Sequence, residues 1–298
     1  MSTPFFRILG SVTVLSVCYW GLYLRPRHQP VVLAEEAEGL SADEAGQLQE
    51  RLTGLMRGRR FEEAQPLAEA MVKAFPGNPI YLRRAAEIQG ELGHPAEEAE
   101  AWERFLRVSP TPGEAFPALL NAYRKLGRTR AAIDACERAV ALEPTNAELL
   151  FYLGRAYEFG KAYPKAREAY RRACELRSGN SDATAGWGRM EVFIGDPARA
   201  IQLVEQVLAR RPDDADCLLV HGMALRQQGQ YARAKVSLER GLKLHPGYGD
   251  FMLVLGGIAE SENHPAEARA WYDRYLAQNG EDAEVRARRD RLAAQERK

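Results

Sequence analysis

Prolines recur along this chain at a spacing of 34 residues, and no other feature of the sequence restricts the possible folds as strongly. The prolines concerned are Pro76, Pro110, Pro144, Pro212 and Pro246. Every interval between them is 34 residues or a multiple of 34, and Ser178 stands where a further proline would fall. A fixed period of this size predicts a stack of helical units in which each unit adds one layer to a continuous core. With each proline at position 32, seven units begin near residues 45, 79, 113, 147, 181, 215 and 249.

Small residues recur at two positions of this period. Position 8 carries Gly154, Gly188, Gly222 and Gly256. Position 20 carries Ala64, Ala132, Ala166, Ala200, Ala234 and Ala268. Small side chains at these places allow two antiparallel helices to approach closely, so each unit is predicted to be a helical hairpin.

A helix stop recurs near position 15, between the two helices of a unit. Four units carry a glycine there, namely Gly93, Gly127, Gly195 and Gly229. Two others carry the polar residues Lys161 and Asn263, and unit one carries Arg59 where the glycine is usual. Glycine ends helices because it adopts the left-handed backbone conformation without strain. The pattern therefore predicts helix, tight turn, helix in every unit.

Two units carry the pattern most clearly, LLFYLGRAYEFGKAYPKAREAYRRACEL from residue 149 and CLLVHGMALRQQGQYARAKVSLERGLKLHP from residue 217. In this order of glycine, tyrosine or leucine, alanine and a closing apolar run, residues 45–282 resemble the tetratricopeptide repeat family. The resemblance implies an all-α, right-handed superhelical solenoid of about seven hairpins. It also implies that a protein or peptide binds along the inner, concave surface.

The first units and the C-terminal segment depart from the pattern. Unit one has Leu52 at position 8, and unit two has Glu98 at position 20, as expected where one face of an array lacks a neighbour. The run SADE at residues 41–44 predicts a capping box, so we expect the array to span residues 42–282. Residues 283–298 place Val285 and Leu292 among charged residues, which favours a capping helix over a basic binding tail.

The N-terminal segment predicts a membrane anchor. From Phe5 to Leu24 the chain is apolar except for Arg7, and a helix of that length spans about 30 Å, the thickness of a bilayer core. Residues 1–24 are thus expected to be a tail and transmembrane helix, followed by a tether over residues 25–41. A signal peptide cleaved after Ala34 and a lipoprotein signal ending at Cys18 are the alternatives.

The side of the membrane on which the array lies stays open. Arg7 before the apolar run balances Arg25 and Arg27 after it, so the positive-inside rule does not decide the orientation. We expect a single-pass protein of the cell (inner) membrane with the repeats on the exported side, although the unpaired cysteines favour a reducing compartment.

Charge and motifs argue against several classes of function. The chain has 41 basic and 41 acidic residues, so it lacks the positive field that nucleic acids require. It has no zinc-protease, phosphate-loop or serine-hydrolase motif, and its four cysteines are too far apart to predict a metal site. His94 and His264 occupy the same position before a proline and are expected to be turn residues. We therefore expect no enzyme activity, no cofactor and no metal.

In the family, first-helix positions 2, 5, 6, 9, 12 and 13 line the concave surface, and here they give a predicted binding groove of arginines and aromatic residues in units three to six. Its residues are Asn121, Arg124, Tyr152, Arg155, Phe159, Arg189, Phe193, Met223 and Arg226. Guanidinium groups and aromatic rings suit the anchoring of peptide carboxylates and side chains. Leu219, Val220, Leu253 and Val254 extend this row as either a ligand surface or covered core.

Some relatives hold the C-terminal carboxylate of chaperones with a clamp of lysine, asparagine and arginine. Of the matching positions here, only Asn121 keeps the residue of that clamp, so a receptor for chaperone tails is not expected.

The function that these features predict is a membrane-tethered scaffold or adaptor that binds a partner protein or extended peptide, for example in the assembly of an envelope or secretion complex. A regulatory subunit that presents substrate to a membrane enzyme or protease is the alternative, and recognition of a polysaccharide is a third possibility. The sequence does not decide the oligomeric state.

Overall fold

The computed structural model describes residues 42–109 and 111–295. This part of the chain folds into fifteen α-helices and one short 3-10 helix, η1 (Pro112–Ala115), and contains no strand. The all-α solenoid that the sequence predicts is thereby confirmed. The expected anchor over residues 1–24 and the tether over residues 25–41 lie outside the described residues. Among the described helices, none combines the length and the apolar character that crossing a bilayer requires.

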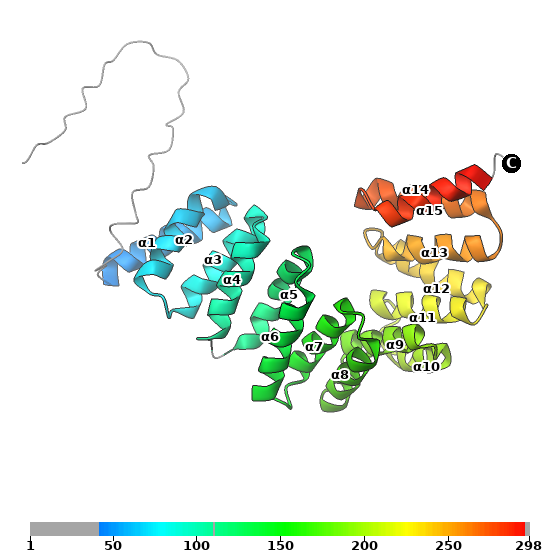
Figure 1. Ribbon diagram of the computed structural model, residues 1–298, viewed down its shortest axis with the longest axis horizontal. Coiled ribbons are helices and arrows are strands. Elements are labelled where there is room, and N and C mark those ends of the chain that lie inside the picture. The colour runs from blue at the N-terminus through cyan, green and yellow to red at the C-terminus, as the bar shows by residue number, and fades with distance from the viewer. Residues whose placement is uncertain (1–41, 110, 296–298) are drawn as a thin grey trace, which may run out of the picture.

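The helices form seven antiparallel pairs, in each of which we name the first the A helix and the second the B helix. The A helices are α1 (Ala42–Arg57), α3 (Pro79–Leu92), α5 (Phe116–Lys125), α7 (Ala147–Phe159), α9 (Ser181–Ile194), α11 (Ala215–Gln227) and α13 (Asp250–Ser261). The B helices are α2 (Phe61–Ala74), α4 (Pro95–Leu106), α6 (Thr129–Leu142), α8 (Tyr163–Leu176), α10 (Pro197–Leu208), α12 (Tyr231–Leu244) and α14 (Pro265–Asn279). Successive pairs stack side by side into an open arc with α1 at one end and α14 and α15 at the other (Figure 1).

Most A helices begin within one residue of the start that the period gives, but α5 begins three residues late, at Phe116. The residue after it, Pro117, has no backbone N–H and cannot donate to the carbonyl of Gly113. The chain therefore passes through η1 first, and Pro117 takes a place in the opening turn of α5, where its missing donor does no harm.

All seven turns between A and B helices place one residue in the left-handed backbone region. Four of these residues are the glycines at position 15, with φ between 66° and 101°. The other three are Arg59, Lys161 and Asn263, with φ between 54° and 59°. The turn geometry is thus the same in every unit, whether or not the residue is a glycine.

The small residues at positions 8 and 20 bring the two helices of a unit together. All six alanines of position 20 are buried. A Cβ atom added at Gly154 would lie 2.7 Å from the ring of Tyr170, which is the residue at position 24 of the same unit. Gly186 on α9 approaches the other side of this ring, with 2.8 Å between its added Cβ and the tyrosine. Tyr170 therefore fills a slot that exists only because two A helices carry glycine there.

The helix α15 (Ala283–Gln295) packs on α14 and ends the described array. Its two apolar residues, Val285 and Leu292, are buried against Ala268 and Tyr272 of α14. The remaining residues of α15 are mostly exposed and charged. The helix thus covers the apolar face of the last pair and presents a polar face to solvent.

Candidate functional site

The A helices form the inner layer of the arc. Consecutive A helices from α5 to α13 contact one another, in addition to their contacts with the B helices. A curved double layer brings its members closer together on the concave side, so this contact identifies the A layer as the inner one. The inner surface of the arc is therefore built mainly from the A helices.

A pocket of 520 Å³ opens between the first three units. Its walls come from α1, α3 and α5, and they include Met56, Glu87 and Asn121. Two residues of the B helix α4, Glu98 and Trp102, also line it, although both are almost completely buried. We call this cavity the N-terminal pocket.

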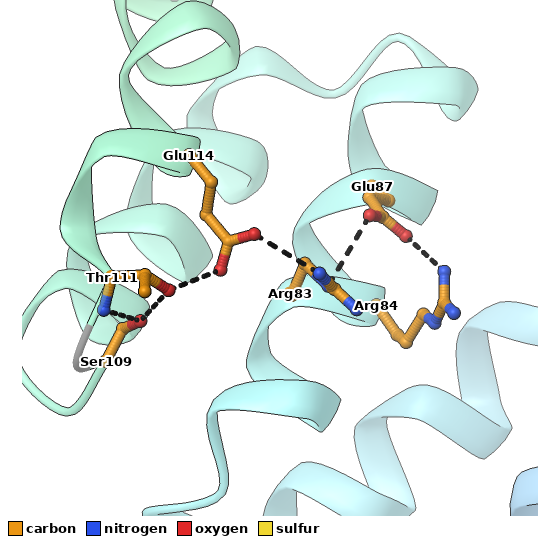
Figure 2. A network of polar contacts seen from close by, with 6 residues as sticks. All are labelled: Arg83, Arg84, Glu87, Ser109, Thr111 and Glu114. Carbon is orange, nitrogen blue, oxygen red and sulfur yellow. Dashed lines mark hydrogen bonds and ion pairs between the residues drawn. The ribbon is translucent and has the colours of Figure 1, made fainter. Parts of the chain in front are cut away.

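The charged residues around the N-terminal pocket are linked by ion pairs that also connect units two and three. Glu87 lies 2.9 Å from Arg84 and 3.8 Å from Arg83, all on α3. Arg83 lies 3.2 Å from Glu114 of η1, which also accepts a hydrogen bond from Thr111. Figure 2 shows these contacts as one chain of side chains running from α3 to the start of unit three. The network fixes the position of η1 relative to α3.

The predicted groove residues on α5 lie beside this pocket. Asn121 lines it, and its side-chain oxygen accepts a 2.9 Å hydrogen bond from Arg124. Arg124 itself is exposed. These two residues therefore form a polar edge where the N-terminal pocket meets the rest of the inner surface.

Four of the predicted groove residues gather on α7 and α9. The guanidinium of Arg155 lies 5.8 Å from the ring centre of Phe159. Phe193 is 46% exposed and stacks on Tyr163, with 4.9 Å between ring centres. Arg189, by contrast, is occupied: its Nε lies 2.6 Å and a terminal nitrogen 3.0 Å from the two carboxylate oxygens of Glu158.

The half-buried Glu158–Arg189 pair is part of a network that includes the buried Tyr170. The hydroxyl of Tyr170 donates to the same carboxylate over 2.8 Å. Burial by itself would lower the pKa of Arg189, but the Glu158 carboxylate outweighs it and raises that pKa further above its usual value. Arg189 thus joins α9 to α7 in the wall of the groove, and its charge is already neutralised.

The remaining groove residues lie partly within the packed layers. Tyr152 is buried and stacks on Phe116 with 5.8 Å between ring centres, although it also borders a second cavity of 570 Å³ between Glu148 and Asp182. Met223 packs against the apolar core around α11. Arg226 lies against Gly257, where an added Cβ would be 2.8 Å from the guanidinium carbon.

The apolar continuation of the groove is mostly covered core. Leu219, Val220 and Val254 are buried, and Leu253 is half-buried. Of the two interpretations that the sequence left open for these residues, the structure supports packing between units. The inner surface available to a partner therefore lies chiefly over units one to five.

Sequence reasoning missed Glu98 and Trp102 as pocket residues. Glu98 stood out only as a departure from the alanine of position 20, which was attributed to the end of the array. The signal that could have found the pocket is a second departure in the same unit, Gly90 at position 12, where all six other units carry a longer side chain.

Comparisons with known proteins agree with this architecture. The tetratricopeptide repeat family model matches residues 50–111, 118–181, 186–234 and 219–283. A tetratricopeptide repeat protein from Parabacteroides merdae has a similar structure, with a TM-score of 0.71 and 17% identity over 83% of this chain and 98% of that chain. The Cut9–Hcn1 hetero-tetramer of the APC/C gives a TM-score of 0.60 at 15% identity, over 87% of this chain and 57% of that chain.

The C-terminal part of a repeat-containing protein from Cytophaga hutchinsonii gives a TM-score of 0.50 at 15% identity, over 80% of this chain and 98% of that chain. No curated protein sequence matches the chain. At these identities the solved structures establish the fold alone. The family model, however, matches well over half of the chain, and its matches cover the stacked helix pairs described above. The chain belongs to the tetratricopeptide repeat family.

Proposed function

We propose that this protein is a scaffold, tethered to a membrane by its N-terminal segment, that binds an extended segment of a partner protein along the inner surface of the arc. Repeat arrays of this kind generally act in protein–protein interaction through their concave surfaces. The observation that carries the proposal is the presence on the A layer of the exposed Phe193 and, on the neighbouring helix, the half-buried pair of Arg155 and Phe159. Aromatic rings and arginines are the side chains that most often anchor protein interfaces.

The groove would bind with little reordering. Phe193 is held by its stacking on Tyr163, and Phe159 lies beside Arg155, so these anchors have already lost much of their side-chain freedom. Behind them, the Glu158–Arg189 pair fixes α9 against α7. A partner that meets fixed side chains loses less entropy from the receptor on binding, which favours affinity.

Tethering would add to this affinity by concentration. The apolar run from Phe5 to Leu24 supports an anchor. The proposal takes this anchor to lie in the cell (inner) membrane, with the repeats on the exported side. An array confined to a membrane meets partners on that membrane at a raised effective concentration. Assembly of an envelope or secretion complex is a process in which such an adaptor would serve.

The proposal assigns no catalysis to the chain. One histidine lies between a carboxylate and a hydroxyl, as in a catalytic triad. His221 Nδ1 is 2.8 Å from Ser237 Oγ, and its Nε2 is 3.5 Å from Glu205. Ser237 is only 8% exposed, however, and it lies in the middle of α12, whose N–H groups are used by the helix itself. These N–H groups are therefore not free to stabilise an oxyanion beside Ser237.

Selection of peptides from a phage-displayed library of random twelve-residue sequences would test the groove. The full-length chain in mild detergent serves as the target, and the selected peptides are then measured by fluorescence anisotropy. Arg155→Glu combined with Phe193→Ala should weaken their binding at least about tenfold, because it removes one charge and one aromatic anchor. Arg189→Glu is unsuitable, since it would place a second carboxylate against Glu158.

Matched changes on the outer layer provide the control. Arg130→Glu and Leu142→Ala alter an exposed arginine and an exposed apolar residue of the B helix α6, and they should leave affinity unchanged. Failure to select any peptide, or equal binding by the groove variant and the control variant, would overturn the proposed function.

A further inference from the structure

Unit two exchanges the sizes of two residues that face each other across its hairpin. Position 20 carries a buried alanine in the other six units, but here it carries Glu98. Position 12 carries Gly90, and a Cβ atom added there would lie only 3.0 Å from Oε1 of Glu98 and 3.1 Å from its carboxyl carbon. The carboxylate therefore occupies space that Gly90 leaves free on the A helix. The glutamate at position 20 and the glycine at position 12 both depart from the repeat, and together they create a site that fits the Glu98 side chain.

This place is unfavourable for a carboxylate that has no ligand. Glu98 is 5% exposed, and its Oε2 has no hydrogen-bond partner. The indole N–H of Trp102, one helical turn further along α4, faces the Glu98 carboxylate and makes no other hydrogen bond. Burial raises the pKa of Glu98, while the charge of Lys125 and the hydrogen bond from the Trp102 indole oppose the shift. Buried polar groups in folded proteins are almost always hydrogen-bonded, so the unpartnered oxygen of Glu98 indicates a missing partner in this pocket.

The other acidic groups of the N-terminal pocket are already paired. Glu87 is bound to Arg84 and Arg83, as Figure 2 shows, and Glu91 lies 3.2 Å from Arg59. Glu98 is therefore the carboxylate in this pocket with unused acceptor capacity. Met56, Phe61 and Trp102 give the pocket apolar surface, and the exposed Lys125 lines it as well. A ligand that suits both features has an aliphatic stem and a cationic end.

We propose that the N-terminal pocket binds a lysine or arginine side chain of the partner segment, whose cationic group donates to the carboxylate of Glu98. This inference rests on the proposed function, since it identifies one side chain of the segment that runs along the inner surface. The stem of the basic residue lies against Met56 and Phe61, while the indole N–H of Trp102 remains directed at the Glu98 carboxylate. The 520 Å³ of the pocket accommodates either basic side chain together with part of the backbone that carries it.

Two properties separate this role from a structural one. If the carboxylate stabilises the fold, replacing it lowers the free energy of unfolding. If it serves to bind a ligand, its burial destabilises the free protein, and replacing it does not lower that free energy. Glu98→Gln keeps the volume that Gly90 accommodates and removes only the charge, so the proposal expects the variant to unfold at the same or a higher temperature than the unchanged chain. The same variant should lose affinity for basic peptides. Opposite effects on stability and on binding are not expected from a purely structural residue.

The test uses the full-length chain in mild detergent and fluorescein-labelled twelve-residue peptides, taken from the library selection described above, that contain a single basic residue. Each peptide is compared with two control peptides, in which the basic residue is replaced by norleucine or by glutamine. Replacing the basic residue should weaken binding to the unchanged chain about tenfold to a hundredfold, the range expected for a charge-assisted hydrogen bond. In Glu98→Ala and Glu98→Gln the three peptides should bind alike. Lysine and arginine versions of one peptide distinguish the two sources of the cation.

Glu191→Gln is the matched control, because Glu191 is equally buried but already accepts a 2.6 Å hydrogen bond from Trp187. It should leave the preference for basic peptides intact. Peptides that bind with no preference for a basic residue, or whose preference survives in both Glu98 variants, overturn this inference and leave the proposed function standing. A melting temperature of Glu98→Gln well below that of the unchanged chain also overturns it. Absence of any binding peptide overturns the proposed function and this inference with it.

Discussion

At the scale of single residues, the turns between A and B helices impose the same backbone on different side chains. Gly127 and Lys161 occupy equivalent positions with φ of 66° and 55°. A residue with a Cβ atom is disfavoured in this conformation by roughly 1–2 kcal/mol, because the Cβ crowds the backbone oxygen. The units with Arg59, Lys161 and Asn263 therefore retain strain that the glycine-containing units avoid.

Replacing Lys161 by glycine should stabilise the array. The relief of strain exceeds the extra freedom that glycine gives the unfolded chain, so we expect about 0.5–1 kcal/mol and a higher urea midpoint. The reciprocal change, Gly127→Ala, should lower the midpoint. A lower midpoint for Lys161→Gly would contradict this account of the turn.

His221 should make stability depend on pH. Burial lowers its pKa, against the opposing attraction of Glu205, and Arg233 adds to the lowering. The unfolded chain then binds a proton at about pH 6.5 that the folded chain does not bind until a lower pH. The contribution of His221 to stability is therefore complete above this range and is lost as the pH falls through it.

His221→Asn keeps a side chain that can bond to Ser237 but cannot titrate. The melting temperature should fall less between pH 7.5 and pH 5.0 in this variant than in the unchanged chain, as measured by circular dichroism. Equal falls in both proteins would show that His221 does not contribute to the pH dependence.

At the scale of helices and turns, close contact between the two helices of a unit depends on glycine at position 8 in units four to seven. Tyr170 lies between Gly154 on α7 and Gly186 on α9, and its hydroxyl reaches Glu158. Any shift of this ring also moves the carboxylate that holds Arg189. Packing within unit four and contact between units four and five are thus coupled through one tyrosine.

Gly154→Ala should destabilise the array by about 1–3 kcal/mol, because its added methyl group overlaps a buried ring that cannot move away. Gly54→Ala is the control, since Gly54 lies within the exposed face of α1 with nothing near its added Cβ. That variant should gain about 0.5–1 kcal/mol from helix propensity alone. Urea unfolding of the two variants measures these changes. A change of the same sign in the free energy of unfolding of both variants would contradict the packing argument.

The sequence predicts the helices and turns well because each repeats. Position 15 is recognisable as a turn even where it carries Lys161, since the neighbouring units supply its register. The late start of α5 could not be predicted from the period, because it results from Pro117, which occurs in this unit only. The N-terminal pocket was missed because it depends on Glu98 and Gly90 facing each other, and each alone resembles an ordinary irregularity of a terminal unit.

At the scale of the whole molecule, the array is held by contacts between neighbouring helices and closed by a cap. Pairs of helices close in sequence account for the stacking, and α15 shields the final pair. In such an arrangement the ends are less stable than the middle, because an end unit has one neighbour instead of two. The cap therefore affects stability more than its mostly charged sequence suggests.

Combining Val285→Ala with Leu292→Ala should lower the free energy of unfolding of the C-terminal units by about 2–4 kcal/mol, since both side chains are buried on α14. Hydrogen exchange measured by mass spectrometry should show faster exchange in α13 and α14, while α3 and α4 are unaffected. Val236→Ala, at an exposed position of α12, is the control and should change neither region. Uniform loss of protection along the whole array would contradict this locality.

The inner contacts between successive A helices have a mechanical consequence. Each contact joins only adjacent units, so a small rotation at every one adds up along the arc without breaking a helix. The arc therefore behaves as an elastic spring whose curvature sets the distance between the N-terminal pocket and the aromatic cluster on α7 and α9. A partner segment that binds at both places stabilises one curvature of the arc. The number of residues between its two anchoring side chains therefore determines which curvature that is.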